Sequence, residues 1–153
     1  MNRYVAGGVA GFLATVPMTV VMVALHRRLP PGEQQPLPPH TITMELAEEA
    51  GVADEIAPPG RQLAATMAGH FGYGAATGAL YAATEDKIDA PAVGKGIAWG
   101  LAVWAVSYLG WLPATGLFPP ATDETPRRNA LMIAAHVVWG AATGALTRRL
   151  ARE

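Results

Sequence analysis

The sequence predicts an all-α, polytopic membrane protein with four transmembrane helices arranged as two parallel two-helix repeats. The first observation behind this prediction is where the charges lie. The 11 Lys and Arg and 12 Asp and Glu residues of the 153-residue chain leave four long segments uncharged: residues 4–26, 62–84, 96–122 and 129–147. A helix of a soluble bundle needs a polar stripe that faces water. About 20 mostly apolar residues cross a hydrocarbon core of about 30 Å, so each segment predicts a membrane span.

The second observation is an internal repeat. The sequence Gly-Ala-Ala-Thr-Gly-Ala-Leu occurs at residues 74–80 and again at 140–146, an offset of 66 residues. In each copy a histidine stands four residues before it and an aromatic residue directly before it (His70 and Tyr73; His136 and Trp139). The repeating unit is two helices, so both copies insert in the same direction and are related by an axis along the membrane normal. We therefore expect the two histidines at equal depth.

The expected spans form a single membrane domain that covers residues 1–153. They are residues 4–25, 63–83, 94–113 and 129–147. Because their number is even, both termini lie on one side of the membrane. That side collects six Lys and Arg residues against five on the other, and Arg148 and Arg149 near the C-terminus favour cytoplasmic termini.

The segments between the spans carry their own signals. Residues 36–39, Pro-Leu-Pro-Pro, predict an extended chain because proline has no N–H to donate to a helix. An external loop with a short helix over residues 41–50 follows, ended by Gly51. A tight acidic turn at 85–89 joins the second and third spans. Residues 114–120 contain too many helix breakers for a helix, so we expect them to fold over the mouth of the bundle.

Small residues recur at helical spacing in all four spans. Each span contains Gly-x-x-x-Gly, at Gly7 and Gly11, Gly74 and Gly78, Gly96 and Gly100, and Gly140 and Gly144. Such faces allow backbones in a membrane to approach closely. Since residues i, i+4, i+7 and i+8 share a helix face, the histidines lie with Thr77 and Thr143 on these packing faces. We expect His70, His136, Tyr73, Trp139, Thr77 and Thr143 to line the interior of the bundle.

Three interpretations of the histidine pair remain open. The two side chains are structural, hydrogen-bonded across helices; or they respond to protons, since the imidazole pKa of about 6.5 lies nearest to physiological pH; or they ligate a haem between two helices. Beyond the haem alternative we expect no cofactor. A metal site is not expected, because no third ligand lies inside the spans.

The residue inventory argues against an enzyme and against nucleic acid. The chain has no cysteine, its single serine is Ser107, and no acidic pair falls within a span. A net charge of −1 provides no basic surface for nucleic acid. Glu33, Arg127, Arg128 and Asn129 fall where loops meet the bundle mouth; they form an entry site or, alternatively, are solvated loop charges.

Three short motifs resemble the YagU-type inner-membrane proteins, a family with a domain of unknown function. They are Glu33 with the Pro-Leu-Pro-Pro of 36–39, the Leu-Pro to Pro-Pro segment of 112–120, and the His-Val-Val-Trp of 136–139. The resemblance implies a multi-pass protein of the bacterial inner membrane, linked to acid-stress tolerance, that forms a homodimer. It implies no established reaction. The expected partners are thus the lipid bilayer and a second copy of the chain.

Overall fold

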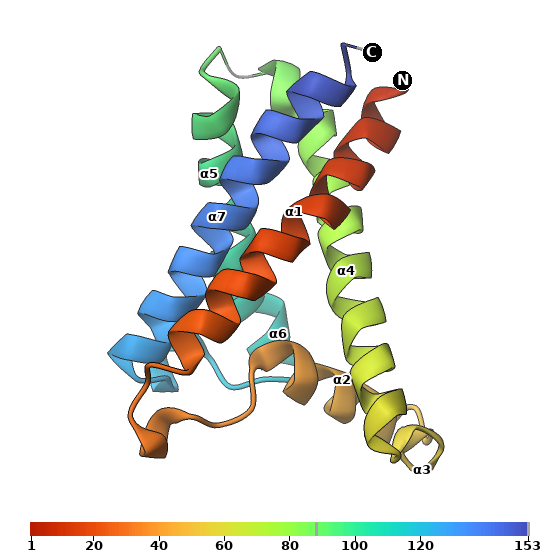
Figure 1. Cartoon of the computed structure of the whole chain (residues 1–153), viewed down its shortest axis with the longest axis vertical. Coiled ribbons are helices and arrows are strands. Elements are labelled where there is room, and N and C mark those ends of the chain that lie inside the picture. The colour runs from red at the N-terminus through yellow and green to blue at the C-terminus, as the bar shows by residue number, and fades with distance from the viewer. Residues whose placement is uncertain (88, 153) are drawn as a thin grey trace.

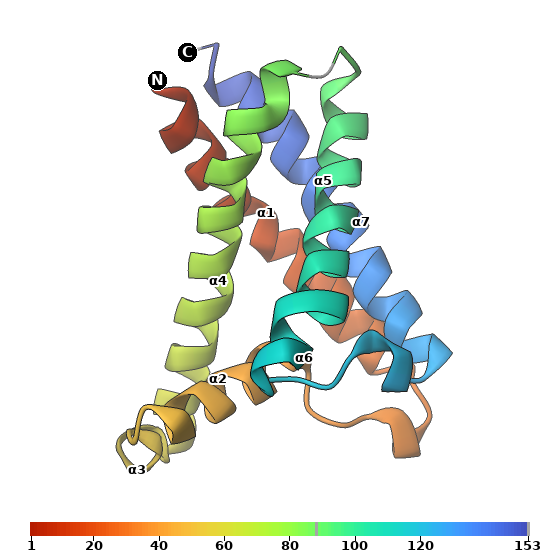
Figure 2. The same cartoon turned by 180° about the vertical axis from the view of Figure 1, so that it is seen from behind.

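Long helices that run side by side make up most of the molecule (Figures 1 and 2). The computed structural model describes residues 1–87 and 89–152, and the described residues contain helices but no strand, which confirms the all-α prediction. The long elements are α1 (Arg3–His26), α4 (Pro59–Thr84), α5 (Ala92–Val106) and α7 (Pro126–Leu150). Both chain ends lie at the same end of the bundle (Figure 1).

Three of the long helices, α1, α4 and α7, begin at residues suited to a free helix end. Pro59 and Pro126 occupy the first turn of α4 and α7, where the missing N–H would have no partner in the helix. The Asn2 side chain caps α1 by accepting a hydrogen bond from the Tyr4 N–H, and the Thr125 side chain caps α7 by accepting one from the Arg128 N–H. As a result α4 and α7 start several residues before the uncharged segments that predicted them.

The loop after α1 contains more helix than predicted. After the short 3-10 turn η1 (Pro31–Glu33), helix α2 (Pro38–Glu49) lies across the end of the bundle opposite the chain termini, followed by α3 (Ala53–Ile56) (Figure 2). The extended conformation expected for residues 36–39 is wrong for the last two, because prolines are accommodated in the first turn of a helix. Gly51, with a φ of 70°, follows the helix as the sequence indicated.

The third long helix changes its winding before its proline. α5 continues into η3 (Ser107–Trp111), a π-helical turn, and then into α6 (Leu112–Thr115). Pro113 has no N–H for the carbonyl four residues earlier, and the wider turn lets the Leu112 N–H bond to the Ser107 carbonyl instead. The chain thus stays helical to Thr115, two residues further than expected, before Gly116 turns it with a φ of 78°.

The remaining connections are short. η2 (Glu85–Lys87) follows α4, and η4 (Ala121–Asp123) precedes α7. Residue 88 of the predicted acidic turn lies outside the described residues.

Within the described residues, three helical segments are long and apolar enough to cross a membrane: Arg3–His26, Ala92–Thr115 and Pro126–Leu150. α4 has comparable length, 26 residues, and no charged residue from 62 to 84, but glycine, threonine and histidine make it less apolar.

The long helices pack in a chain rather than in a closed square. α1 packs along both α4 and α7, α5 packs along α7, and α4 and α5 make little backbone contact. A Cβ atom at Gly11 would overlap the Gly74 carbonyl, and one at Gly96 would overlap the Gly140 carbonyl. Two helix pairs, α1 with α4 and α5 with α7, therefore approach at glycine, and α1 and α7 join the pairs.

Candidate functional site

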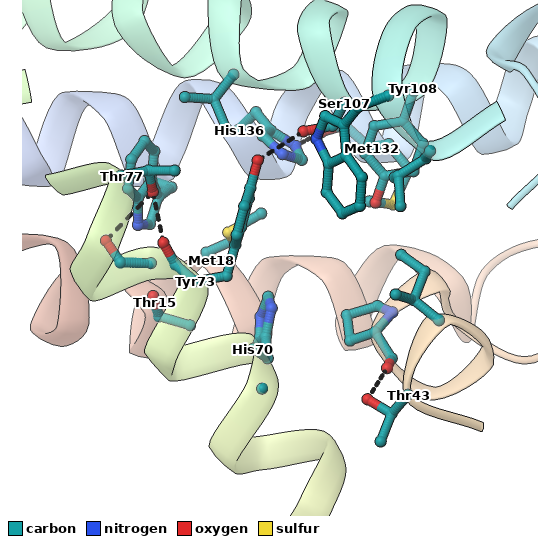
Figure 3. A pocket seen from close by; sticks show the side chains of 18 of the residues that line it. Thr15, Met18, Thr43, His70, Tyr73, Thr77, Ser107, Tyr108, Met132 and His136 are labelled. Atoms are coloured by element: carbon teal, nitrogen blue, oxygen red, sulfur yellow. Dashed lines mark hydrogen bonds between the residues drawn. The ribbon is translucent and has the colours of Figure 1, made fainter. Parts of the chain in front are cut away.

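A cavity of about 190 Å³ lies inside the bundle, toward the end covered by α2 (Figure 3). All four long helices contribute to its wall, and α2, η3 and the first residue of α6 complete it. The lining residues are Thr15, Met18, Pro39, Ile42, Thr43, Leu46, Gly69, His70, Tyr73, Gly74, Thr77, Val103, Ser107, Tyr108, Trp111, Leu112, Met132, His136 and Trp139. Most of this wall is apolar, and both histidines of the repeat belong to it.

His136 is held by its own helix. Its Nδ1 lies 2.8 Å from the Met132 carbonyl oxygen one turn earlier, and the residue is 5% exposed. A carbonyl oxygen only accepts hydrogen bonds, so Nδ1 carries the proton in the neutral ring. Nε2 is then left with a lone pair. The Tyr108 ring packs edge-on against the imidazole at a centroid distance of 5.9 Å, which fixes the ring plane.

His70 enters the same cavity from α4 and is held less tightly. Its Nε2 is buried and has no hydrogen-bond partner among the described residues. The Phe71 ring lies edge-on to the imidazole, with centroids 6.0 Å apart. A buried polar atom without a partner costs about 1–3 kcal/mol, so Nε2 of His70 favours any occupant of the cavity that bonds to it.

Other polar side chains of the wall already have partners. Thr15 donates to the Gly11 carbonyl at 2.8 Å, and Thr77 donates to the Tyr73 carbonyl at 2.7 Å. The hydroxyls of Tyr73 and Ser107 lie 2.9 Å apart and join α4 to η3. Nε2 of His70 differs from these hydrogen-bonded groups because it has no partner among the described residues.

Among the residues that the structure describes, no Asp, Glu, Lys or Arg belongs to the wall. The titratable groups that face the histidines are the phenols of Tyr73 and Tyr108. A proton placed on either imidazole therefore finds no carboxylate in the cavity wall to balance it.

Most of the chain, residues 16–144, matches the model of a family described as "Protein of unknown function (DUF1440)". The chain belongs to the DUF1440 family. The matched range contains every residue of the cavity wall except Thr15. No curated protein and no solved structure matches this DUF1440 chain.

The sequence-predicted residues of this DUF1440 protein fall into two groups. His70, His136, Tyr73, Trp139 and Thr77 all line the cavity. Thr143, the counterpart of Thr77 in the repeat, is fully buried in α7 away from the cavity wall, and its hydroxyl has no partner among the described residues. The two copies of the repeated sequence therefore contribute unequally to the site.

Several lining residues have no signal in the repeat. Ser107, Tyr108 and Trp111 come from the π-helical turn, and the α2 residues Ile42 and Thr43 cover the cavity from the loop side. One signal for the first group was present in the sequence: Pro113 requires the preceding turn to change its hydrogen bonding. Ile42 and Leu46, one turn apart in α2, form the apolar face that meets the bundle end.

The predicted bundle-mouth residues meet in a separate arrangement. Arg127 pairs with the Glu33 carboxylate at 3.0 Å, and the Thr125 hydroxyl donates to the same carboxylate at 2.8 Å. Asn129 donates to the Ala121 carbonyl at 2.6 Å.

Arg128 is the centre of that arrangement, and it is buried, 6% exposed. Its guanidinium pairs with Glu124 and donates to the backbone carbonyls of Glu33, Gln35 and Pro36. The alternative of solvated loop charges is thus wrong for Arg128. Its donors bind the chain itself, so the residue ties the loop after α1 to the start of α7.

The described residues contain no group of three His, Cys, Asp or Glu side chains placed to hold a metal ion.

Proposed function

We propose that this DUF1440 protein is a non-enzymatic, multi-pass protein of the bacterial inner membrane, with a buried histidine pair that responds to protons. The proposal includes four spans. Three helical segments have the length and composition of spans, and α4 packs along α1 with no charge from residue 62 to residue 84. A helix with polar residues that face a bundle interior is accommodated in a membrane.

The proposed topology follows from the repeat and the positions of the chain ends. Two parallel two-helix repeats in a single domain return the chain to the side from which it started, which agrees with both termini lying at one end of the bundle (Figure 1). The arginines near the C-terminus favour the cytoplasm for that end. The resemblance to YagU-type proteins supports a link to acid-stress tolerance and a homodimer.

A single observation carries the proton response: His70 and His136, from two different helices, line one cavity that has no carboxylate in its wall. A charged imidazole in such surroundings loses its hydration without gaining a counter-ion. Two charged rings also repel each other. Protonation therefore stabilises arrangements in which α4 and α7 move apart and water enters the cavity.

The test compares variants of the purified protein in mild detergent. We expect the thermal stability of the wild type to fall between about pH 8 and about pH 5, because a charged imidazole in a cavity without a counter-ion opposes the closed arrangement of the helices. The double variant His70→Gln/His136→Gln should lose most of this dependence. The matched control His26→Gln/His40→Gln changes the two histidines outside the cavity and should keep it. Equal pH dependence in the two double variants would overturn the proposal.

The same variants connect the cavity to acid stress. Cells that express the wild type or the His26→Gln/His40→Gln variant should survive an acid challenge better than cells that express His70→Gln/His136→Gln. Unchanged survival with a stably folded protein would make the pair structural.

Haem ligation is the second candidate, and one observation favours it. The Nδ1 bond of His136 to a backbone carbonyl leaves Nε2 free, which is the arrangement of many histidine ligands. The cavity volume of about 190 Å³ lies below the 300–1,000 Å³ of typical ligand pockets, which argues against a porphyrin. An absorption spectrum of the purified protein decides: a Soret band that disappears in His70→Ala and His136→Ala would replace proton response with haem binding.

A further inference from the structure

We propose that the cavity binds the phenolic ring of a neutral, membrane-soluble molecule, which enters sideways between α4 and η3. The inference uses the same cavity as the proton response but does not depend on that response. It is argued from the size of the cavity, the hydrogen-bonding character of its two histidines and the construction of the α4–η3 side.

The volume of the cavity fits a single aromatic ring. An engineered apolar cavity of about 150 Å³ binds benzene, and this cavity measures about 190 Å³. The additional volume fits one or two small substituents. Side chains such as Met18, Val103 and Met132 supply apolar surface, and none of the described residues in the wall is charged. An uncharged ring is therefore compatible with the cavity, whereas an anion or a cation would lie there without a partner.

The two histidines favour a hydroxyl group as the substituent on the ring. His136 Nε2 carries a lone pair, since Nδ1 donates to the Met132 carbonyl, so it accepts a hydrogen bond from an O–H group. Nε2 of His70 is buried and unpartnered among the described residues, and a neutral imidazole nitrogen serves as donor or acceptor according to its tautomer. A phenolic hydroxyl both donates and accepts. It thus bonds to His136 and also offers its oxygen to His70.

The α4–η3 side provides an entrance from the lipid. The helices α4 and α5 make little backbone contact, in contrast to the other neighbouring pairs. Here a hydrogen bond between the Tyr73 and Ser107 hydroxyls closes the gap, with the Trp111 ring 6.1 Å from the Tyr73 ring. Tyr73 is 41% exposed and Trp111 is 38% exposed, and both also line the cavity. The side chains of Tyr73 and Trp111 therefore separate the cavity from the lipid-facing surface, and a hydrogen bond between the Tyr73 and Ser107 hydroxyls joins α4 to η3 across this entrance.

Two sources supply this chemistry: a small free phenol, and the head group of a lipid-soluble hydroquinone whose tail remains between α4 and η3. Both use the same ring and hydroxyl. The experiment below separates them.

The first arm titrates the wild-type protein in detergent, near pH 7.5 where imidazoles are neutral, with 4-methylphenol and with toluene. The two probes have similar shape and differ by the hydroxyl. Tryptophan fluorescence reports binding, because Trp111 and Trp139 line the cavity. We expect 4-methylphenol to bind roughly 3- to 10-fold more tightly than toluene, as one net hydrogen bond provides. The preference should disappear in His136→Leu and persist in His26→Leu.

A second pair of variants tests the cavity without changing a histidine. Gly69 lines the cavity, and a Cβ atom there would meet only the Thr43 hydroxyl, at an ordinary 3.6 Å. Gly69→Val should therefore fold and bind neither probe. Gly72→Val, three residues along the same helix with nothing within 4 Å of its Cβ position, should bind both as the wild type does.

The source is decided by competition. A hydroquinone with a ten-carbon alkyl tail should displace 4-methylphenol if the site takes a lipid head group, and should fail to displace it if the site takes a free phenol. Tyr73→Phe, which removes the bond to Ser107, should speed association of the tailed probe.

Equal affinity of the wild-type protein for toluene and 4-methylphenol, or binding of neither, would overturn the proposal and leave an apolar or water-filled cavity. Neither result affects the test of the proton response, because the pH dependence of thermal stability is measured without any ligand.

Discussion

The two glycine-packed helix pairs use the same seven-residue sequence and yet differ where the site lies. In the α1–α4 pair Gly11 lies against Gly74, and in the α5–α7 pair Gly96 lies against Gly140. One turn further along, α5 has Gly100, which lies against the His136 carbonyl, whereas α1 has Thr15. α5 and α7 therefore stay close at the histidine, while α1 and α4 diverge toward the α2 end (Figure 1).

The consequence is visible in the histidines. His136 is buried and its Nδ1 donates to the Met132 carbonyl one turn earlier, whereas His70 lies at the edge of the cavity with its Nε2 unpartnered among the described residues. A repeated helix face therefore does not specify a repeated site. The residue that the partner helix presents, Thr15 or Gly100, decides whether the backbones meet or leave space for a ligand.

The largest expected loss of stability comes from removing Arg128, which connects the start of α7 to the loop after α1. Arg128→Leu removes a buried guanidinium and leaves Glu124 and three backbone carbonyls without it. Breaking a buried ion pair costs about 3–5 kcal/mol, so we expect a loss of that order in the free energy of unfolding in detergent. Arg127→Leu, next in the chain, removes a pair whose arginine is 67% exposed, and should cost at most about 1 kcal/mol. Similar costs for the two variants would show that Arg128 does not hold the loop.

An intermediate loss of stability is expected when alanine replaces Gly140 of the α5–α7 pair, and a smaller one when it replaces the equivalent Gly74 of the α1–α4 pair. A Cβ atom at Gly140 would meet the Gly96 backbone, whereas one at Gly74 would meet the Thr15 side chain first. Backbone yields less readily than a side chain, so Gly140→Ala should cost about 1–3 kcal/mol and Gly74→Ala less. Thermal unfolding measures both.

Two controls belong to the glycine comparison. Gly72→Ala, with nothing within 4 Å of its Cβ position, should leave stability unchanged or slightly higher. Thr15→Ala should partly rescue Gly74→Ala by removing the hydroxyl that the new methyl meets. If Gly74→Ala were the more costly variant, the α1–α4 pair would be the tighter one and the comparison would be reversed.

The last comparison concerns Tyr73 and Trp139, the aromatic residues directly before the repeated sequence, and Tyr73→Phe has the smallest expected effect. Trp139 donates to the Gly11 carbonyl at 3.1 Å and is 2% exposed, so Trp139→Phe loses a buried hydrogen bond and ring volume at a cost of about 1–3 kcal/mol. Tyr73→Phe loses one half-exposed bond to Ser107 and should cost below about 1 kcal/mol. Denaturant titration of both variants checks the order, and a costlier Tyr73→Phe would mean that the α4–η3 contact holds the bundle together.

Much of the fold was predictable from the arrangement of charge and breakers. Uncharged segments located the long helices, and Gly51 located the end of the short one. The errors came at prolines: Pro38 and Pro39 open α2 instead of preventing it, and Pro113 is preceded by a π-helical turn and followed by two more helical residues. A proline forbids one hydrogen bond, and whether the helix starts, widens or stops there depends on what the neighbouring segments accept.

The candidate site was predictable in part. The histidines and their neighbours Tyr73, Thr77 and Trp139 were named from the repeat, and all line the cavity. Three features of the site could not be predicted from the sequence: the cover provided by α2, the wall formed by the π-helical turn, and the position of Thr143 away from the cavity. Each of them depends on a distant segment of the chain.

By itself, the sequence determined that this chain is helical, that its long helices are poor in charge, and that two histidines recur at the same place in a repeated motif. These properties are local, because hydrogen bonding within a helix and the transfer of side chains out of water depend on nearby residues. The tertiary structure alone decided that both histidines share one cavity, that Nε2 of His70 lacks a partner among the described residues, and that Arg128 is buried. Those properties depend on how closely two backbones approach, which is set by the residue each helix presents to its partner.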